Sequence, residues 1–164
     1  MFSPTLILLA RAVHILAGIY WAGAVFITVG SLMRAAPAIG PGLVPVMKQI
    51  GQRSGIAALL TLIAGLYLFA ALHAQDDSVG AKVLGVGAAA ALLAFVVGLA
   101  VNKPAGGKLV RLQASPPADA AERQRLVAAL QSRIRLGTRL VAALVGISVL
   151  CMAVFRYAGA LSSG

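Results

Sequence analysis

Acidic residues, cysteine and aromatic side chains are all scarce in this sequence of 164 residues. Aspartate and glutamate together number four, against 14 lysines and arginines. The single cysteine, Cys151, excludes an intrachain disulfide and any zinc or iron–sulfur site that needs several cysteines. Aromatic residues make up 5% of the chain, which argues against a membrane β-barrel, because barrels carry aromatic girdles and alternating strands.

Charge of either sign is also rare. Charged residues make up 11% of the chain and hydrophobic residues 60%. A soluble domain of this size would need a far more charged surface, so the composition predicts that much of the chain lies in lipid. Alanine, leucine, valine, isoleucine and 18 glycines supply most of the apolar content, which suits helices that pack through small residues. We therefore predict an all-α membrane protein.

Several motifs that carry chemistry are missing. The sequence has no P-loop, no Gly-x-Gly-x-x-Gly after a predicted strand and no His-Glu-x-x-His. No aspartate or glutamate falls inside an apolar run, which argues against a carboxylate proton relay and against a cation-coupled transporter.

Four apolar runs are long enough to cross a bilayer, whose hydrocarbon core of about 30 Å needs roughly 20 helical residues. We predict one integral membrane domain over residues 1–164, a bundle of four transmembrane helices with a cytoplasmic extension of the fourth. Because the earliest cation, Arg11, lies inside the first run, we expect this run to be a retained helix and not a signal peptide. The predicted spans are residues 5–32, 55–72, 79–101 and 136–155.

Ten of the 14 basic residues lie in two segments between the predicted spans, residues 33–54 and 102–135. Cytoplasmic loops of membrane proteins carry an excess of lysine and arginine. These segments are therefore predicted to be cytoplasmic, while both termini and the Asp76–Asp77 turn face the periplasm of a bacterial-type inner membrane. Loop anchoring also accounts for the net charge of +10, so we expect a lipid bilayer and no nucleic acid as a partner.

The second basic segment contains a predicted helix start. Ser115-Pro116-Pro117 ends one segment, and Asp119 and Glu122 fall in the first turn of the next helix, where the helix dipole favours anions. That helix is predicted to continue into the fourth span. It either covers the inner face of its own bundle or provides a docking surface for partners or lipid headgroups. Its apolar face is formed by Leu126, Leu130 and Ile134.

The first span carries the strongest candidate site, because ionisable side chains inside a membrane are costly and usually functional. A neutral imidazole there can ligate a haem iron or a soft metal ion, and Arg11 could pair with a haem propionate. Two alternatives are a packed His14 hydrogen-bonded to another helix and an Arg11 that reaches the outer headgroups. Four residues recur at helical spacing on one face, which we expect to point into the bundle: Arg11, His14, Gly18 and Trp21.

The remaining soft ligands lie toward the predicted outer side. His73 ends the second span, and Cys151 and Met152 lie late in the fourth. With His14 they suit a Cu(I) path, and we take His14, His73 and Met152 as candidate metal ligands. The alternatives are an interfacial polar residue at a helix end for His73 and ordinary apolar packing for the sulfur groups. A haem held between both histidines is disfavoured, because His14 is expected to lie deeper than His73.

The stretch from Arg11 to Gly23 contains His14 followed, seven residues later, by Trp21-Ala-Gly. It resembles the copper-resistance D (CopD)-like membrane proteins, which often open with this arrangement. The resemblance implies a helical membrane protein whose first-span histidine holds haem or copper. Shorter similarities lie at Arg53–Ala57, Pro104–Leu112 and Cys151–Tyr157.

A weaker likeness connects the chain to the HemJ-type protoporphyrinogen oxidases, which also have a first-span histidine followed by tryptophan. That likeness implies a link to haem synthesis. The third span of this chain has no internal basic residue, however, and Lys82 lies at its edge.

Three functions follow as hypotheses. The leading one is a small CopD-like inner-membrane protein that binds haem b or copper through His14, with Arg11 and Trp21 beside the cofactor. The alternative is a non-catalytic accessory or structural subunit of a larger respiratory or photosynthetic membrane complex, packed against other membrane-protein subunits. A third is a membrane oxidase that acts on a porphyrin. The sequence identifies no catalytic residue.

Overall fold

A computed structural model describes residues 3–34, 43–115 and 117–160 of the chain. Within these residues the chain is helical and forms no strand, which confirms the predicted all-α fold. Two short π-helical segments, η1 and η3, extend α1 and α4. The elements in chain order are α1 (Pro4–Ile27), η1 (Thr28–Leu32), α3 (Leu43–Leu72), α4 (Val79–Val97), η3 (Gly98–Asn102), α5 (Lys103–Ala114) and α6 (Ala120–Ala160).

Four of the described helical rods are long and apolar enough to cross a membrane, as predicted. Many of their large apolar side chains lie on the surface; Leu8, Leu16 and Leu136, for example, are 69%, 70% and 72% exposed. Such a surface is stable in hydrocarbon and not in water. The four rods are Pro4–Leu32, Pro45–Leu72, Val79–Ala114 and Ala120–Ala158.

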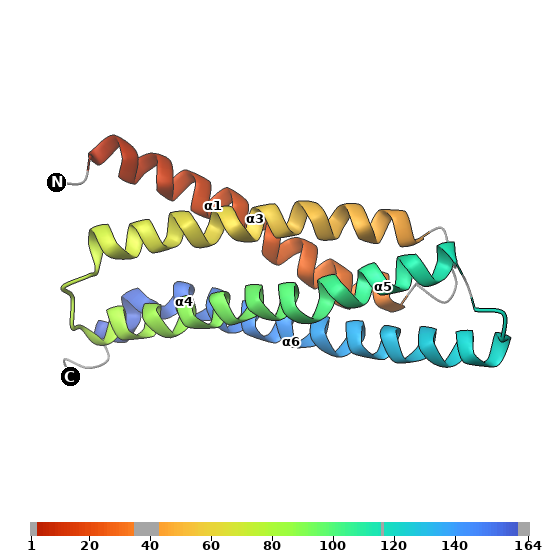
Figure 1. The fold of residues 1–164 in the computed structure, drawn as a ribbon. Helices are drawn as coiled ribbons and strands as arrows, with labels where there is room; N and C mark the ends of the chain where they lie inside the picture. Colours follow the sequence, from red (N-terminus) through yellow and green to blue (C-terminus); the bar gives the residue numbers. More distant parts are fainter. Residues whose placement is uncertain (1–2, 35–42, 116, 161–164) are drawn as a thin grey trace.

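The rods associate as two helix pairs (Figure 1). In one pair α1 crosses α3 obliquely, and in the other α4 lies along α6. The start of α1 and the end of α6 lie at the same end of the bundle as the turn between α3 and α4, which we call the turn end. The opposite end, where α5 and the start of α6 lie, is called the arm end.

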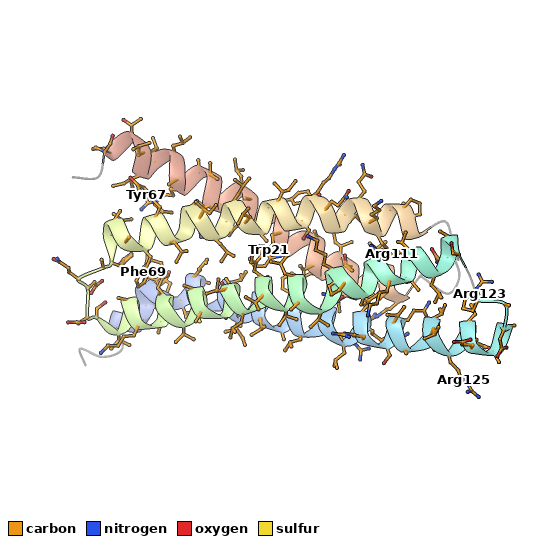
Figure 2. The ribbon with its side chains drawn as sticks, viewed as in Figure 1. Trp21, Tyr67, Phe69, Arg111, Arg123 and Arg125 are labelled. Carbon is orange, nitrogen blue, oxygen red and sulfur yellow. The ribbon has the colours of Figure 1, made fainter. Side chains whose placement is uncertain are left out.

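A small apolar core joins the two pairs. Trp21, only 6% exposed, lies near the middle of the bundle, where α1 crosses α3 (Figure 2). Its neighbours in the core are mostly alanine and valine, which allow the helix axes to approach closely. Each rod contributes two residues to this core: Trp21 and Val25, Ala57 and Ala58, Ala91 and Ala94, Val141 and Val145.

The α4/α6 pair is packed through glycine. A Cβ atom on Gly87 would lie 2.8 Å from Cβ of Cys151, and one on Gly80 would lie 2.7 Å from the carbonyl oxygen of Phe155. These two glycines therefore make the close helix contact that the composition predicts. Gly85 and Gly98 do not, because a Cβ atom on either would meet nothing within 4 Å. Beside these glycines on α4, Ala81 and Ala91 are buried and Ala89 is exposed.

Helix α3 begins at Leu43, well before the predicted start at Gly55, so part of the predicted loop of residues 33–54 is helical. Pro45 lies in the first turn of this helix. Proline is tolerated there because the first N–H groups of a helix have no intrahelical acceptor. Lys48 and Arg53 therefore lie on α3, while residues 35–42 of the same predicted loop lie outside the described residues.

The predicted extension of the fourth helix is confirmed. Helix α6 has 41 residues, and at 1.5 Å per residue it is about 60 Å long, roughly twice the hydrocarbon core. The backbone N–H of Ala121 donates to Oδ1 of Asp119 at 2.8 Å, and Glu122 lies in the first turn, as the sequence predicts.

A second extension was not expected from the sequence: α5 continues the α4 rod past the predicted end at residue 101. The junction is π-helical, and the N–H of Lys103 donates to the carbonyl of Gly98, five residues earlier. Pro104 follows at once and has no N–H to donate. The wider π turn accommodates this proline without ending the rod.

Candidate functional site

His14 lies ten residues into α1, about 15 Å along the helix from Pro4. Its Nδ1 atom is 2.8 Å from the carbonyl oxygen of Thr61 in α3. A carbonyl oxygen only accepts hydrogen bonds, so in the neutral imidazole Nδ1 carries the proton and donates it. The lone pair is then on Nε2. The hydroxyl of Thr61 is occupied separately, because it donates to the carbonyl of Ala57 at 2.7 Å.

Two glycines shape the contact around this imidazole. A Cβ atom on Gly65 would lie 2.8 Å from Cε1 and 2.9 Å from Nδ1 of His14, so the ring occupies the space that a side chain would need. On α1, a Cβ atom on Gly18 would lie 3.6 Å from Cγ2 of Thr61. His14 and Gly18 thus face Thr61 and Gly65 at the helix crossing. The periodicity of α1 does not identify Thr61 and Gly65 as the residues that face it. The one indication in the sequence is that Thr61 and Gly65 are four residues apart, as His14 and Gly18 are.

This geometry agrees with both interpretations of His14 made from the sequence. The bond to Thr61 is the interhelical contact expected of a packed imidazole. It is also the contact that metal-ligating histidines usually make with their second nitrogen, where it fixes the tautomer and the ring orientation. Among the described residues nothing hydrogen-bonds to Nε2, and the side chain is only partly buried. The contact therefore fixes the ring and leaves Nε2 without a hydrogen-bond partner among the described residues.

The other residues of the predicted α1 face do not share this environment. Arg11, expected to point into the bundle, is exposed, and Trp21 is part of the four-rod core. The difference arises because α1 diverges from α4 and α6 toward the turn end, so a face that is buried at Trp21 is no longer covered one helical turn before His14 (Figure 1). Arg11 is thus placed where a long side chain can reach the membrane surface at the turn end.

His73 lies at the end of α3, among groups of the turn. Its Nδ1 atom is 3.3 Å from Oδ2 of Asp76, and its ring contacts Phe69 and the edge of Phe155, with centroid distances of 6.2 and 6.1 Å. The backbone N–H of Ser78 donates to Oδ1 of Asp76 at 3.0 Å. Hydrogen bonds from the Ser78 backbone and hydroxyl, and then from His73, lower the pKa of the Asp76 carboxyl.

The candidate metal ligands are spread over the molecule. His73 is eight residues beyond Gly65, so it lies about 12 Å along α3 from the His14 contact. Cys151 packs against Gly87 of α4, and the neighbouring Met152 is also partly buried on α6. In the described part of the chain no three histidine, cysteine, aspartate or glutamate side chains come together. The structure therefore brings His14 to Thr61 and Gly65, and not to His73.

In comparisons with known proteins, no family model matches the chain, and neither a curated protein nor a solved structure is significantly similar to it.

Proposed function

We propose that this chain is a small CopD-like protein of a bacterial-type inner membrane and that Nε2 of His14 is a ligand of haem b or copper. The observation that supports it is the 2.8 Å contact from Nδ1 of His14 to Thr61, which holds the ring and leaves Nε2 with its lone pair. The contact lies about 15 Å along α1, a depth at which a membrane protein rarely keeps an imidazole without a function.

Of the two groups, haem b fits the described residues better. A haem iron could be held by a single imidazole from the chain, and the partly buried His14 would supply one. Bound there, haem would supply one-electron chemistry. A Cu(I) ion needs at least a second soft ligand beside Nε2, and His73 lies about 12 Å away along α3. Copper bound to Nε2 of His14 would therefore need further ligands other than Thr61 and Gly65, the residues that contact His14.

The proposed orientation places the turn end in the periplasm. The start of α1 and the end of α6 lie there together with Asp76 and Asp77, while residues 103–135 at the arm end hold seven cations and two acids. The positive-inside rule assigns such a basic end to the cytoplasm. His14 then lies in the half of the bundle nearer the periplasm.

The test is an oxidised-minus-reduced visible spectrum, with metal analysis, of the detergent-purified chain expressed with haem and copper supplied. His14→Ala is expected to lose the Soret band or the bound copper. His73→Ala, which removes the other histidine of the chain, is the matched control and is expected to keep them. A wild-type protein without colour or stoichiometric metal would refute the proposal, as would equal loss in the two variants.

A second candidate function is a non-catalytic accessory subunit of a larger membrane complex. The outer half of α1 favours it, because this half lies against α3 and exposes large apolar side chains such as Leu8 and Leu16, which no other described helix covers. A partner helix could cover these side chains as lipid does. Comigration with a respiratory or photosynthetic complex on native gels, lost on replacing Leu16 by glutamine, would favour it. Migration as the isolated chain in mild detergent would count against it.

A further inference from the structure

The arm end carries positive charge that the chain does not neutralise. We define the arm as residues 103–135, comprising α5 and the first part of α6. It holds seven cations, and its two acids are Asp119 and Glu122. Among the described residues the one close contact between a basic and an acidic side chain lies elsewhere, between His73 and Asp76. The arm cations are all exposed: Lys103, Lys108, Arg111, Arg123, Arg125, Arg133 and Arg135.

Between α5 and α6 the arm contains an open groove of about 380 Å³. Its floor is apolar and includes Leu126, which is 42% exposed. One cation stands on each wall, Lys108 from α5 and Arg133 from α6. Figure 1 shows that α5 and α6 separate toward their connection. The groove is lined by Lys108, Leu112, Leu126, Ala129, Leu130 and Arg133.

With the span ends predicted at residues 101 and 136, the groove lies outside the bilayer, because α5 and the first part of α6 carry the apolar rods beyond those residues. Leu112 is ten residues beyond Asn102, about 15 Å along the rod, and Leu126 precedes Gly137 by about 16 Å. Asn102 and Gly137 lie at the ends of the predicted spans. The headgroup layer on each side of the hydrocarbon core is about 5–7 Å thick. The apolar floor is therefore beyond the reach of lipid that surrounds the spans.

We propose that this groove binds an acidic amphipathic helix of a partner protein. An apolar floor between two helices accepts the apolar face of a third, as in other helix-in-groove complexes. The cations on the walls then face the acidic side of that helix, and complementary charge selects it over other apolar helices. A second copy of the chain would bring like charges together, and a nucleic acid would have no use for the apolar floor. The inference does not depend on a cofactor at His14.

The test uses the full chain in nanodiscs of phosphatidylcholine, which carries no net charge. The probe is a labelled 20-residue peptide with leucine at helical spacing and glutamate elsewhere, and binding is measured by fluorescence anisotropy. Lys108→Glu with Arg133→Glu reverses both groove walls and is expected to weaken binding at least about tenfold. Arg111→Glu with Arg125→Glu changes the arm by the same charge on the same helices outside the groove lining. This control is expected to weaken binding less than about threefold.

Leu126→Gln tests the floor without changing charge and is expected to weaken peptide binding by about fivefold, because it removes one buried leucine contact. Helical circular dichroism equal to that of the wild type shows that each variant is folded. Equal weakening by the two double variants would overturn the proposal, since it would reflect the field of the arm alone. So would equal binding of a scrambled peptide of the same composition, or of a single-stranded oligonucleotide that responds to the groove variants in the same way.

Discussion

The two helix pairs are held together by different means. The α4/α6 pair has close contacts at three glycines: Gly80 near the turn end, Gly87 at mid-bundle and Gly137 near the arm. The α1/α3 pair crosses obliquely, and its described polar contact is the single bond from His14 to Thr61. The first pair continues as the arm, while the second diverges toward the turn end (Figure 1).

This difference separates a structural pair from a candidate functional one. Where a glycine lets two helices approach this closely, no ligand has room between them, and the contact serves packing. In the α1/α3 pair the imidazole of His14 packs on Gly65, so the helices still meet, but Nε2 of the ring keeps its lone pair available. Four substitutions test the contrast, from the largest expected effect to the smallest.

Gly87→Ala is expected to have the largest effect. The new methyl group would lie 2.8 Å from Cβ of Cys151 and 3.3 Å from the carbonyl oxygen of Ser148, atoms that move only with the α6 backbone. Overpacking of this kind lowers the free energy of unfolding by about 2 kcal/mol. The measurement is steric trapping in detergent. Gly85→Ala on the same helix meets open space and is expected to be neutral, so equal losses would contradict the assigned packing.

Gly65→Ala comes next. Its methyl group would lie 2.8 Å from Cε1 of His14, so the ring must move and its hydrogen bond to Thr61 breaks. Loss of such a bond lowers the free energy of unfolding of a membrane protein by about 1 kcal/mol. The ¹⁵N chemical shifts of the imidazole are expected to change from a single Nδ1–H tautomer to a mixture. Gly55→Ala on the same helix, where a Cβ atom meets nothing within 4 Å, leaves the shifts unchanged. A single tautomer in Gly65→Ala would mean that Thr61 does not fix the ring.

Gly137→Ala is expected to cost less, because its methyl group would meet the end of a flexible side chain, the buried Oδ1 of Asn102. That oxygen has no hydrogen-bond partner among the described residues. Asn102→Ala removes the nearer of two obstacles, since Cγ1 of Val101 stays 3.0 Å from the new methyl group, so the double variant should recover about 0.5 kcal/mol relative to the sum of the single changes. A double-mutant cycle in unfolding free energy measures this coupling, and strict additivity would show that the two residues do not touch.

Asp76→Asn has the smallest expected effect and concerns the turn that links the pairs. The pKa of Asp76 is lowered in the folded chain from an ordinary value of 3.8. Its contribution to stability is therefore present above that value and is lost as the pH falls through the lower folded pKa. The expected result is a thermal midpoint that depends less on pH below about 4 than in the wild type. Because the carboxyl is exposed, a shift of many degrees would contradict the assignment.

The sequence alone determined the four helices long and apolar enough to cross a membrane, the all-α fold of the described residues and the start of α6. Each depends on local chemistry: a run of about 20 apolar residues, or acidic residues in a first helical turn. The start of α3 and the continuation into α5 could not be predicted as well. A proline usually marks a break in a helix. Pro45, however, falls in the first turn of α3, and Pro104 follows a π-helical turn, so both rods continue.

The candidate site depended on tertiary structure. Spacing in α1 placed Arg11, His14 and Trp21 on one side of one helix, and it could not determine what that side meets. The hydrogen-bond partner of His14 is 47 residues away in sequence, and Arg11 is exposed because the crossing angle carries α1 away from the other rods. That angle follows from where small residues let the helices approach, a property of two surfaces together. Periodicity within one helix therefore identified His14, and the packing of two helices decided that Nδ1 is held by Thr61 while Nε2 stays open.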